Sequence, residues 1–293
     1  MKTGLLRSWM FVPGQKQKMI DKALNLPDVA AIMLDIEDGV PPQEKENARQ
    51  LIGASLAKIS PDTEGPARFV RINSIGHEYM YRDIAAVVQS GTEGLAIPKI
   101  ESPDQVRLVS SLLDQRERDM KLPVGKIRLL VALESPRGLL DAYAIASSSP
   151  RVIGMMFGAE DYGKELGLPL NREGEASEML HARNMLVIAT AAARIQSVDG
   201  VWPNLKDIDG LKRHTLQSRR LGFTGMSSIN PVQIAVINEI FAPSAEELEF
   251  CNHVIQLFDE GIARGDGSIA LGGQLLDLPI VERARMMVAS AKK

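Results

Sequence analysis

The chain has 293 residues, of which 45% are hydrophobic and 24% charged, as is ordinary for a globular protein with a large core. The net charge of −3 and the lack of a basic arm or stripe argue against a nucleic-acid partner. The single cysteine, Cys251, excludes an internal disulfide, and the sequence shows neither a signal-peptide pattern nor an apolar run long enough for a bilayer, so we expect a cytoplasmic protein without a membrane partner.

Short apolar runs, each typical of a strand buried on both faces, recur along most of the chain. They are residues 8–12, 30–36, 67–72, 94–100, 127–134, 152–158, 197–202 and 223–229. Between them, apolar residues recur at three- and four-residue spacing, as at Val106, Val109 and Leu113, which predicts helices. These alternating units predict an α/β fold, a (β/α)₈ TIM barrel. A doubly wound open sheet is the main alternative, but no Gly-rich dinucleotide-binding motif follows an early run.

The residues beyond the eighth unit are expected to form an extension. We therefore divide the chain into a barrel, residues 1–242, and a C-terminal helical and loop extension, residues 243–293. Within the extension, Ser244 at the N-cap, Glu247 at the capping-box position and Gly265 beyond the end predict one long helix.

Charged and polar residues cluster at the carboxyl ends of the predicted strands, where a barrel of this kind builds its active site. They are Asp35, Glu37, Asp38, Arg71, Asn73, Lys99, Glu134, Arg137, Glu160, Asp161, Asp199 and Asn230. Acids and bases that converge on one rim are harder to explain as solvated surface than any of them alone. The sequence therefore predicts the functional site at this rim.

Glu134 and Asp161 end neighbouring predicted strands. Two carboxylates with water in the remaining positions make a common Mg²⁺ site, because this cation prefers oxygen ligands. The alternative is a pair of rim acids neutralised by Arg71, Lys99 or Arg137, and the pattern alone leaves both open. The histidines, which are scattered over predicted helices and loops and offer no zinc site, are His77, His181, His214 and His253.

Arg71 lies at the end of the third run. An arginine that points inward there could bind a carboxylate through two parallel hydrogen bonds or stabilise an enolate oxygen. A structural ion pair with Glu37 is the alternative, and the two roles are compatible. The backbone of Gly158, Ala159 and Glu160, where the chain turns away from the sixth run, could supply N–H groups to an anion.

The motifs resemble those of the citrate lyase β-subunit family, within the larger group of malyl-CoA lyase-like and HpcH/HpaI-type aldolases. They run in family order over nearly the whole chain. The matching segments are RSWMFVPG (7–14), MLDIEDGVPPQEK (33–45), FVRIN (69–73), AIPKIES (96–102), ALESPRG (132–138), FGAEDY (157–162), LGFTGMSSINPVQI (221–234), FAPSAEE (241–247) and LLDLPIVERAR (275–285). The pair ESPRG and FGAEDY is the most specific.

This resemblance implies a Mg²⁺-dependent barrel that makes or breaks a carbon–carbon bond beside an acyl thioester. It implies that Glu134 and Asp161 are the metal ligands and that Arg71 binds the substrate. Glu37 matches an acid that supports this arginine and the water molecules on the metal.

The thioester carrier is expected to be coenzyme A or an acyl-carrier protein. Arg7 and Lys16 lie in the motif that relatives use near the carrier. Many relatives have lysines where this chain has Met226 and Gln274. These differences bear on which thioester carrier the protein binds, because the motifs with the metal ligands and Arg71 are intact.

Asp277 matches an aspartate that, in relatives, reaches into the site of a neighbouring subunit. The resemblance therefore implies a homo-oligomer, a trimer or a multiple of it, in which Asp277 acts as acid or base. The surrounding segment 268–279 is Gly-rich and expected to be loop-like, and a last helix should run from Pro279 to about Ala291. The alternative is that Asp277 only caps this helix.

The expected activity is cleavage of a citryl-, malyl- or citramalyl-type acyl thioester to a 2-oxo acid and a short acyl thioester. An acyl-CoA thioester hydrolase and a pyruvate-type class II aldolase on the same scaffold are alternatives. A non-catalytic thioester-binding subunit belongs to another class, and the intact Glu134, Asp161 and Arg71 argue against it.

Overall fold

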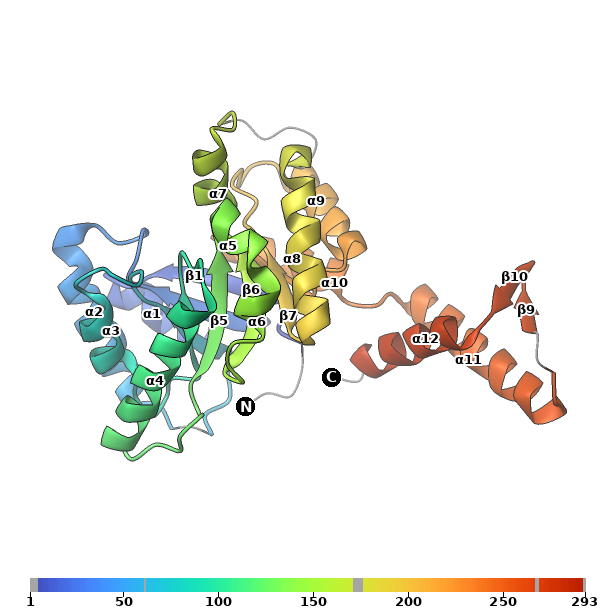
Figure 1. Cartoon of the computed structure of the whole chain (residues 1–293), viewed down its shortest axis with the longest axis horizontal. Coiled ribbons are helices and arrows are strands. Elements are labelled where there is room, and N and C mark those ends of the chain that lie inside the picture. The colour runs from blue at the N-terminus through green and yellow to red at the C-terminus, as the bar shows by residue number, and fades with distance from the viewer. Residues whose placement is uncertain (1–4, 61, 171–175, 267–268, 292–293) are drawn as a thin grey trace.

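A computed structural model describes residues 5–60, 62–170, 176–266 and 269–291 (Figure 1). Parallel strands form a closed barrel in chain order, with β8 pairing back to β1. The barrel strands are β1 (Ser8–Pro13), β2 (Ala31–Asp35), β3 (Ala67–Arg71), β4 (Gly94–Ile97), β5 (Arg128–Leu133), β6 (Val152–Phe157), β7 (Gln196–Asp199) and β8 (Gly225–Ser228). The predicted (β/α)₈ barrel is confirmed.

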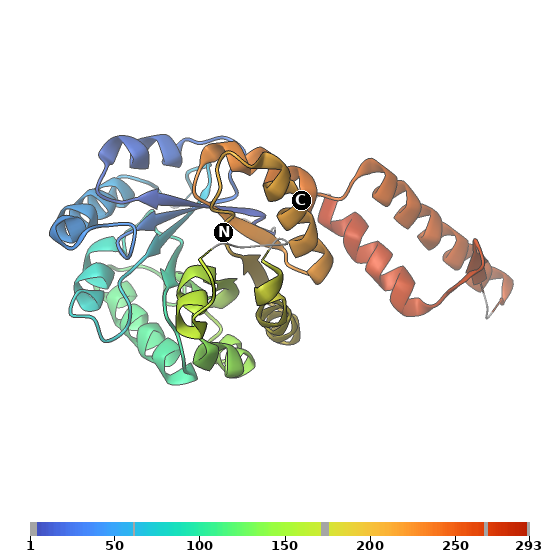
Figure 2. The same cartoon turned by 90° about the horizontal axis from the view of Figure 1, so that it is seen from above.

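Helices surround the strands as an outer ring, which Figure 2 shows from above. The α-helices of the ring are α1 (Gln17–Leu24), α2 (Lys45–Ala57), α3 (Met80–Val87), α4 (Pro103–Asp119), α5 (Pro136–Leu140), α6 (Ala142–Ala146), α7 (Ala159–Leu166), α8 (Leu180–Ala193), α9 (Ile208–Leu221) and α10 (Ile234–Phe241). Short 3₁₀ helices are η1 (Pro42–Glu44), η2 (Ser177–Met179) and η3 (Pro231–Gln233). In the described part of the chain, no helix combines the length and apolarity that crossing a membrane requires.

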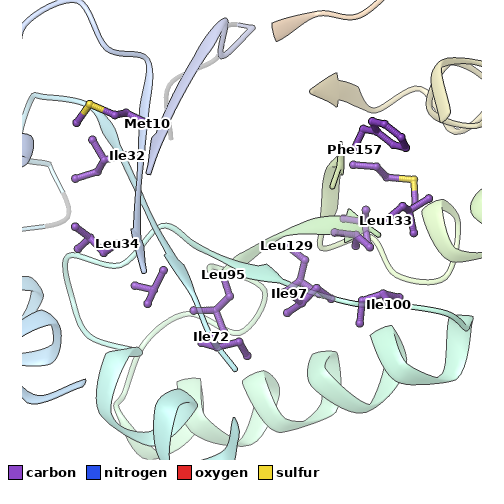
Figure 3. Close-up of a cluster of buried hydrophobic side chains, with 14 of the residues drawn as sticks. Met10, Ile32, Leu34, Ile72, Leu95, Ile97, Ile100, Leu129, Leu133 and Phe157 are labelled. Atoms are coloured by element: carbon purple, nitrogen blue, oxygen red, sulfur yellow. The ribbon is translucent and has the colours of Figure 1, made fainter. Parts of the chain in front are cut away.

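Alternate residues of each strand pack in two different cores. In β2, Met33 packs inside the barrel near Trp9 and Phe69, whereas Ile32 and Leu34 pack outward beneath the helices. The rings of Trp9 and Phe69 meet edge to face with centroids 4.9 Å apart. Figure 3 shows the outer core between the strands and their helices. Burial on both faces explains why the strands are continuous apolar runs in the sequence.

The seventh strand ends earlier than predicted. The run 197–202 predicts a strand through Trp202, but β7 ends at Asp199. The Gly200 N–H donates to Asp199 Oδ1 at 2.9 Å, which turns the backbone out of the sheet. Asp199 Oδ2 is held by Arg183 Nη2 and Ser218 Oγ, both at 2.6 Å. A buried ion pair therefore fixes the point where the chain leaves β7.

The last part of the described chain forms an arm that projects from the barrel (Figures 1 and 2). It contains α11 (Ala245–Arg264) and α12 (Leu278–Ala291), which pack against each other around Cys251, Val254 and Val281. The predicted capping box at Ser244 forms, and the Gly265 cap has a φ of 81°, so the long helix is confirmed.

The segment between the two arm helices is a hairpin and not the predicted loop. Strands β9 (Ile269–Leu271) and β10 (Gln274–Leu276) pair antiparallel. Gly272 and Gly273 have φ angles of 55° and 83°. Two adjacent residues with positive φ form the tight turn that suits a two-residue hairpin. The glycines therefore connect two strands, which a count of glycines alone does not reveal.

Candidate active site

A cavity of about 330 Å³ opens at the carboxyl end of the barrel, as predicted from the strand-end charges. Its charged lining residues are Asp35, Asp38, Arg71, Glu134, Glu160 and Asp161. Its apolar lining includes Phe11, Met156, Phe157, Val201 and Ile229. The cavity is large enough for a small organic acid, and its charged residues lie on or follow β2, β3, β5 and β6.

Arg71 is held in one orientation by two acids and a ring. Its Nε and Nη2 donate to the two oxygens of Asp35 at 2.7 Å each, and its Nη1 lies 3.0 Å from Glu37 Oε2. The Phe11 ring centroid lies 4.7 Å from the guanidinium carbon. The expected ion pair with Glu37 forms, but Asp35 is the bidentate partner. The strand-end pattern includes Asp35 without identifying this role.

Asp35 also shapes the loop that follows β2. Its Oδ1 accepts a hydrogen bond from the Glu37 N–H, and its Oδ2 accepts one from the Gly39 N–H, both at 2.9 Å. The same carboxylate thus orients Arg71 and the backbone that carries Glu37. Burial raises the pKa of the Glu37 carboxyl, although the charges of Arg71 and Lys99 act in the opposite direction.

Lys99 bridges the acids on the cavity rim. Its Nζ lies 2.6 Å from Glu37 Oε1, 2.8 Å from Asp38 Oδ2 and 4.0 Å from Asp161 Oδ2. Burial acts to lower the pKa of Lys99, but its hydrogen bonds to Asp38 and Glu37 outweigh burial and the pKa is raised. The salt-bridged alternative for Glu134 and Asp161 is thus met only in part, because Lys99 pairs closely with Glu37 and Asp38 and reaches Asp161 at 4.0 Å. Arg137 pairs instead with Asp141, 3.0 Å away on its own helical stretch.

Glu134 is a buried acid without comparable compensation. Burial, with the negative charges of Glu37 and Asp161, raises the pKa of Glu134 to about 7. The Lys99 backbone N–H donates to Glu134 Oε2 at 3.2 Å. A Cβ at position 158 would overlap the Glu134 side chain, so Gly158 gives this carboxylate its space.

The donor set fits one hard divalent cation. Glu134 is 7% exposed and the Asp161 side chain 33% exposed, and both line the same cavity. The raised pKa of Glu134 indicates a carboxylate whose charge nearby groups do not offset, which a cation would do. Within the described ranges, no group of three or more His, Cys, Asp or Glu side chains is arranged for a metal. Water or ligand oxygens would complete the coordination, as is usual for Mg²⁺.

The backbone N–H groups of Gly158, Ala159 and Glu160 are expected to be open to an anion, and the structure differs from this at Gly158. The Gly158 N–H donates to Leu133 O at 2.9 Å, so this amide serves the barrel ladder and not a ligand. Helix α7 begins at Ala159, and first-turn amides have no acceptor within their own helix. Asp161 lies in this first turn, where the helix dipole stabilises a negatively charged carboxylate.

Three predicted residues, Arg7, Lys16 and Asp277, are not among the residues that line the cavity. Arg7 precedes β1, at the amino end of the barrel, where its Nη2 donates to Ser290 O at 3.1 Å. Lys16 is exposed in the loop between β1 and α1. Asp277 follows β10 on the arm, and its Oδ1 accepts a hydrogen bond from the Ile280 N–H at 3.2 Å. The capping alternative for Asp277 is thus present, and the carrier and cross-subunit roles stay predictions.

Met226, at one position that departs from many relatives, is fully buried and faces the helices. Its Sδ accepts a hydrogen bond from Thr215 Oγ1 at 3.3 Å. This side chain is therefore part of the outer core and does not reach the cavity.

A buried polar network supports the site and has no simple signal in the sequence. Lys45, in the first turn of α2, donates through Nζ to Ile36 O and Glu37 O at 2.8 Å and to Asn73 Oδ1 at 2.7 Å. Asn73 in turn donates to Asp83, which Arg49 also contacts. Lys45 is near Glu37 in sequence, but helical patterning does not show that it turns back beneath the loop.

Comparisons with known proteins identify the family of this chain. Residues 7–231 match the HpcH/HpaI aldolase/citrate lyase family. The chain is 35% identical over 287 residues to the citrate lyase subunit beta of Leuconostoc mesenteroides subsp. cremoris, covering 98% of this chain and 93% of that protein. It is 32% identical over 286 residues to a (3S)-malyl-CoA thioesterase of Cereibacter sphaeroides, covering 98% and 94%. The solved structure of CitE from Mycobacterium tuberculosis in complex with magnesium, acetoacetate and coenzyme A is 27% identical, with a TM-score of 0.78 and 98% of each chain covered. The chain belongs to the HpcH/HpaI aldolase/citrate lyase family.

Proposed function

We propose that this protein is a Mg²⁺-dependent carbon–carbon lyase that cleaves a citryl-, malyl- or citramalyl-type acyl thioester to a 2-oxo acid and a short acyl thioester. The observation that carries the proposal is the cavity in which Arg71, Glu134 and Asp161 meet at the carboxyl end of the barrel. The relatives of this chain include a citrate lyase subunit beta and a protein whose structure was solved in complex with magnesium and coenzyme A. The coenzyme A in the solved structure favours coenzyme A as the thioester carrier of this protein.

Glu134 and Asp161 would hold the cation, and Glu37, in the loop after β2, would support it. When bound, Mg²⁺ supplies a Lewis acid that lowers the pKa of a substrate hydroxyl and neutralises charge. Mg²⁺ also accounts for the otherwise unfavourable burial of Glu134 between other acids.

Arg71 would bind the substrate and stabilise the negative charge that develops on it. Cleavage removes the hydroxyl proton, breaks the adjacent carbon–carbon bond and leaves its electron pair on the acyl thioester as an enolate. Because Asp35 and Glu37 already orient the guanidinium, it needs no reorganisation when the charge appears. Preorganised electrostatic stabilisation of this kind is usually the largest contribution to such a rate.

Protonation of the enolate carbon completes the reaction, and we assign it to Asp277 of a neighbouring subunit. Asp277 lies on the arm, which projects from the barrel of its own chain (Figure 1). The leucines 275 and 278 on either side of it are about half exposed, which suits a partner surface. The proposal therefore includes a homo-oligomer, a trimer or a multiple of it, with the arm as a lid, and a cytoplasmic location in keeping with the single cysteine.

Thioester hydrolysis is the second candidate, because one relative of similar identity is a (3S)-malyl-CoA thioesterase. Both activities need a thioester bound near the same cavity, and their products differ. The purified protein should be incubated with Mg²⁺ and citryl-, malyl- and citramalyl-CoA, and the products identified by mass spectrometry. A 2-oxo acid with a short acyl-CoA supports the lyase, whereas free CoA with the intact hydroxy acid supports the hydrolase.

A further inference from the structure

Ser227 places a hydroxyl without a partner in the cavity. Its side chain is 1% exposed and lines the cavity, and Ser227 Oγ has no hydrogen-bond partner among the described residues. The next residue differs, because Ser228 Oγ donates to Trp9 O at 3.4 Å. Met226, on the other side, faces the outer core. Of these neighbours on β8, only Ser227 therefore points toward the cavity.

A buried hydroxyl without a partner is unfavourable, because burial removes its hydrogen bonds to water without replacing them. Alanine would fill the same place at a lower cost. Phe11, on the neighbouring strand β1, and Ile229, just beyond β8, also line the cavity, and their side chains are apolar and offer no acceptor. Such an exception to hydrogen-bond satisfaction is typical of a site that a ligand completes.

The position of β8 indicates which part of a ligand would reach this hydroxyl. In the closed order of the barrel, β8 lies across from the strands β3 and β5, which position Arg71 and Glu134. A ligand held by Arg71 and Glu134 would therefore extend its far end toward Ser227. The lining residues on the strands beside β8, Phe11 and Pro13 of β1 and Gly200 and Val201 after β7, carry no polar side-chain group, so Ser227 is the polar side chain that this far end meets.

We propose that the Ser227 hydroxyl hydrogen-bonds a polar substituent of the 2-oxo acid portion and so selects substrates that carry a second carboxylate over those that carry a methyl group. This inference rests on the proposed lyase function. A carboxylate oxygen accepts the hydroxyl proton, whereas a methyl group leaves the hydroxyl unsatisfied. Sites built to hydrogen-bond a substrate group reject analogues that lack it.

The test measures binding of oxaloacetate and pyruvate by calorimetry, with Mg²⁺ present, to the wild type and to Ser227→Ala. We expect the variant to bind oxaloacetate roughly tenfold to a hundredfold more weakly. Its affinity for pyruvate should stay within about twofold, because no hydrogen bond is lost. The melting temperature of the free variant should be unchanged or higher, since an unsatisfied hydroxyl has been removed.

Ser228→Ala is the matched control. It removes a hydroxyl from the same strand whose partner is a backbone carbonyl, so it should not change the preference between the two acids. Equal affinities of the wild type and Ser227→Ala for oxaloacetate, or equal losses for both acids, would overturn the assignment of Ser227 and leave the lyase proposal intact. A wild type that binds neither acid would likewise overturn the assignment of Ser227, and the product analysis with the three hydroxyacyl-CoA substrates would decide the lyase proposal separately.

Discussion

The Arg71 guanidinium and the Asp35 carboxylate are joined by two hydrogen bonds of 2.7 Å each, and the two residues are register partners on β3 and β2. A cross-strand pair at the carboxyl end of adjacent strands has little freedom to move. Glu37 and Phe11 hold the same guanidinium from other sides. The site thus fixes the direction of the N–H groups as well as the position of the charge.

Arg71→Lys should therefore lower kcat on the preferred thioester by about a hundredfold, because lysine keeps the charge but loses the planar fork. Steady-state kinetics would measure the loss, and circular dichroism would check the fold. Arg107→Lys, on the exposed face of α4, is a matched control that should have wild-type kinetics. An unchanged kcat and KM in Arg71→Lys would show that Arg71 is only structural.

Removal of either proposed metal ligand should weaken cation binding and activity together. Glu134→Gln and Asp161→Asn each remove one anionic oxygen donor, so we expect Mg²⁺ affinity to fall about tenfold or more. Titration calorimetry on the free protein measures this without relying on turnover. Glu165→Gln, an exposed change on the same helix as Asp161, should leave the affinity unaltered. Full activity in excess EDTA would refute the metal site.

The ionised carboxylate of Asp199 should stabilise the barrel at neutral pH and lose this effect in acid. Burial acts to raise the pKa of Asp199, but Arg183, His214 and Ser218 outweigh it and the pKa is lowered. A lowered pKa stabilises the fold above the unfolded value, near pH 4, and this contribution is lost as the pH falls through the folded value. Asp199→Asn leaves Arg183 buried without its acid, so we expect a loss of about 3 to 5 kcal/mol at pH 7.

Urea unfolding of the wild type and Asp199→Asn between pH 7 and pH 3 measures this difference. The difference in unfolding free energy between the two proteins should be constant at neutral pH. It should narrow as the pH falls below about 4, because Asp199 of the unfolded chain then binds a proton that the folded Asp199, with its lowered pKa, does not yet take up. Asp209→Asn, in the first turn of α9 and without a buried partner, is the control. A gap that stays the same down to pH 3 would contradict the assigned role of the Asp199 carboxylate.

Much of the fold could be predicted because a parallel barrel buries both faces of its strands. The apolar runs and the spacing of Val106, Val109 and Leu113 report this burial directly, and these three residues are buried in α4. The end of β7 could not be predicted, because it depends on the hydrogen bond from Gly200 to Asp199 and on a distant arginine. The hairpin of the arm could not be predicted from the sequence, because two adjacent glycines are equally common in an irregular loop.

The sequence predicted where the candidate site lies but not which of its side chains pair with one another. Strand ends gave Arg71, Glu134 and Asp161 a common rim, which the cavity confirms. Which acid pairs with which base depends on register and rotamers, so Asp35 as the fork partner emerged only from the structure. Ser227 carries no sequence signal, because an inward hydroxyl on a short strand resembles any other strand serine. Asp277 is separated from the cavity within one chain, so its role depends on contacts between chains.

A shared site predicts complementation between two inactive variants. Asp161→Asn and Asp277→Asn should each be inactive alone, but subunit exchange should restore part of the activity, because some mixed interfaces join an intact cavity to an intact arm. Exchange is verified by native mass spectrometry of the mixture. If exchange occurs without recovery, Asp277 does not act across subunits. Glu282→Gln, an exposed change on α12, the helix that follows Asp277, should be active without mixing.

The measurement that tests the lyase proposal most directly is cleavage of the preferred hydroxyacyl-CoA in D₂O with Mg²⁺ present. Cleavage through an enolate predicts a 2-oxo acid and a short acyl-CoA that carries one solvent deuteron at the carbon freed from the broken bond. Arg71→Lys should form this labelled product about a hundredfold more slowly. Free CoA together with an unlabelled, intact hydroxy acid would contradict carbon–carbon cleavage and identify a thioester hydrolase.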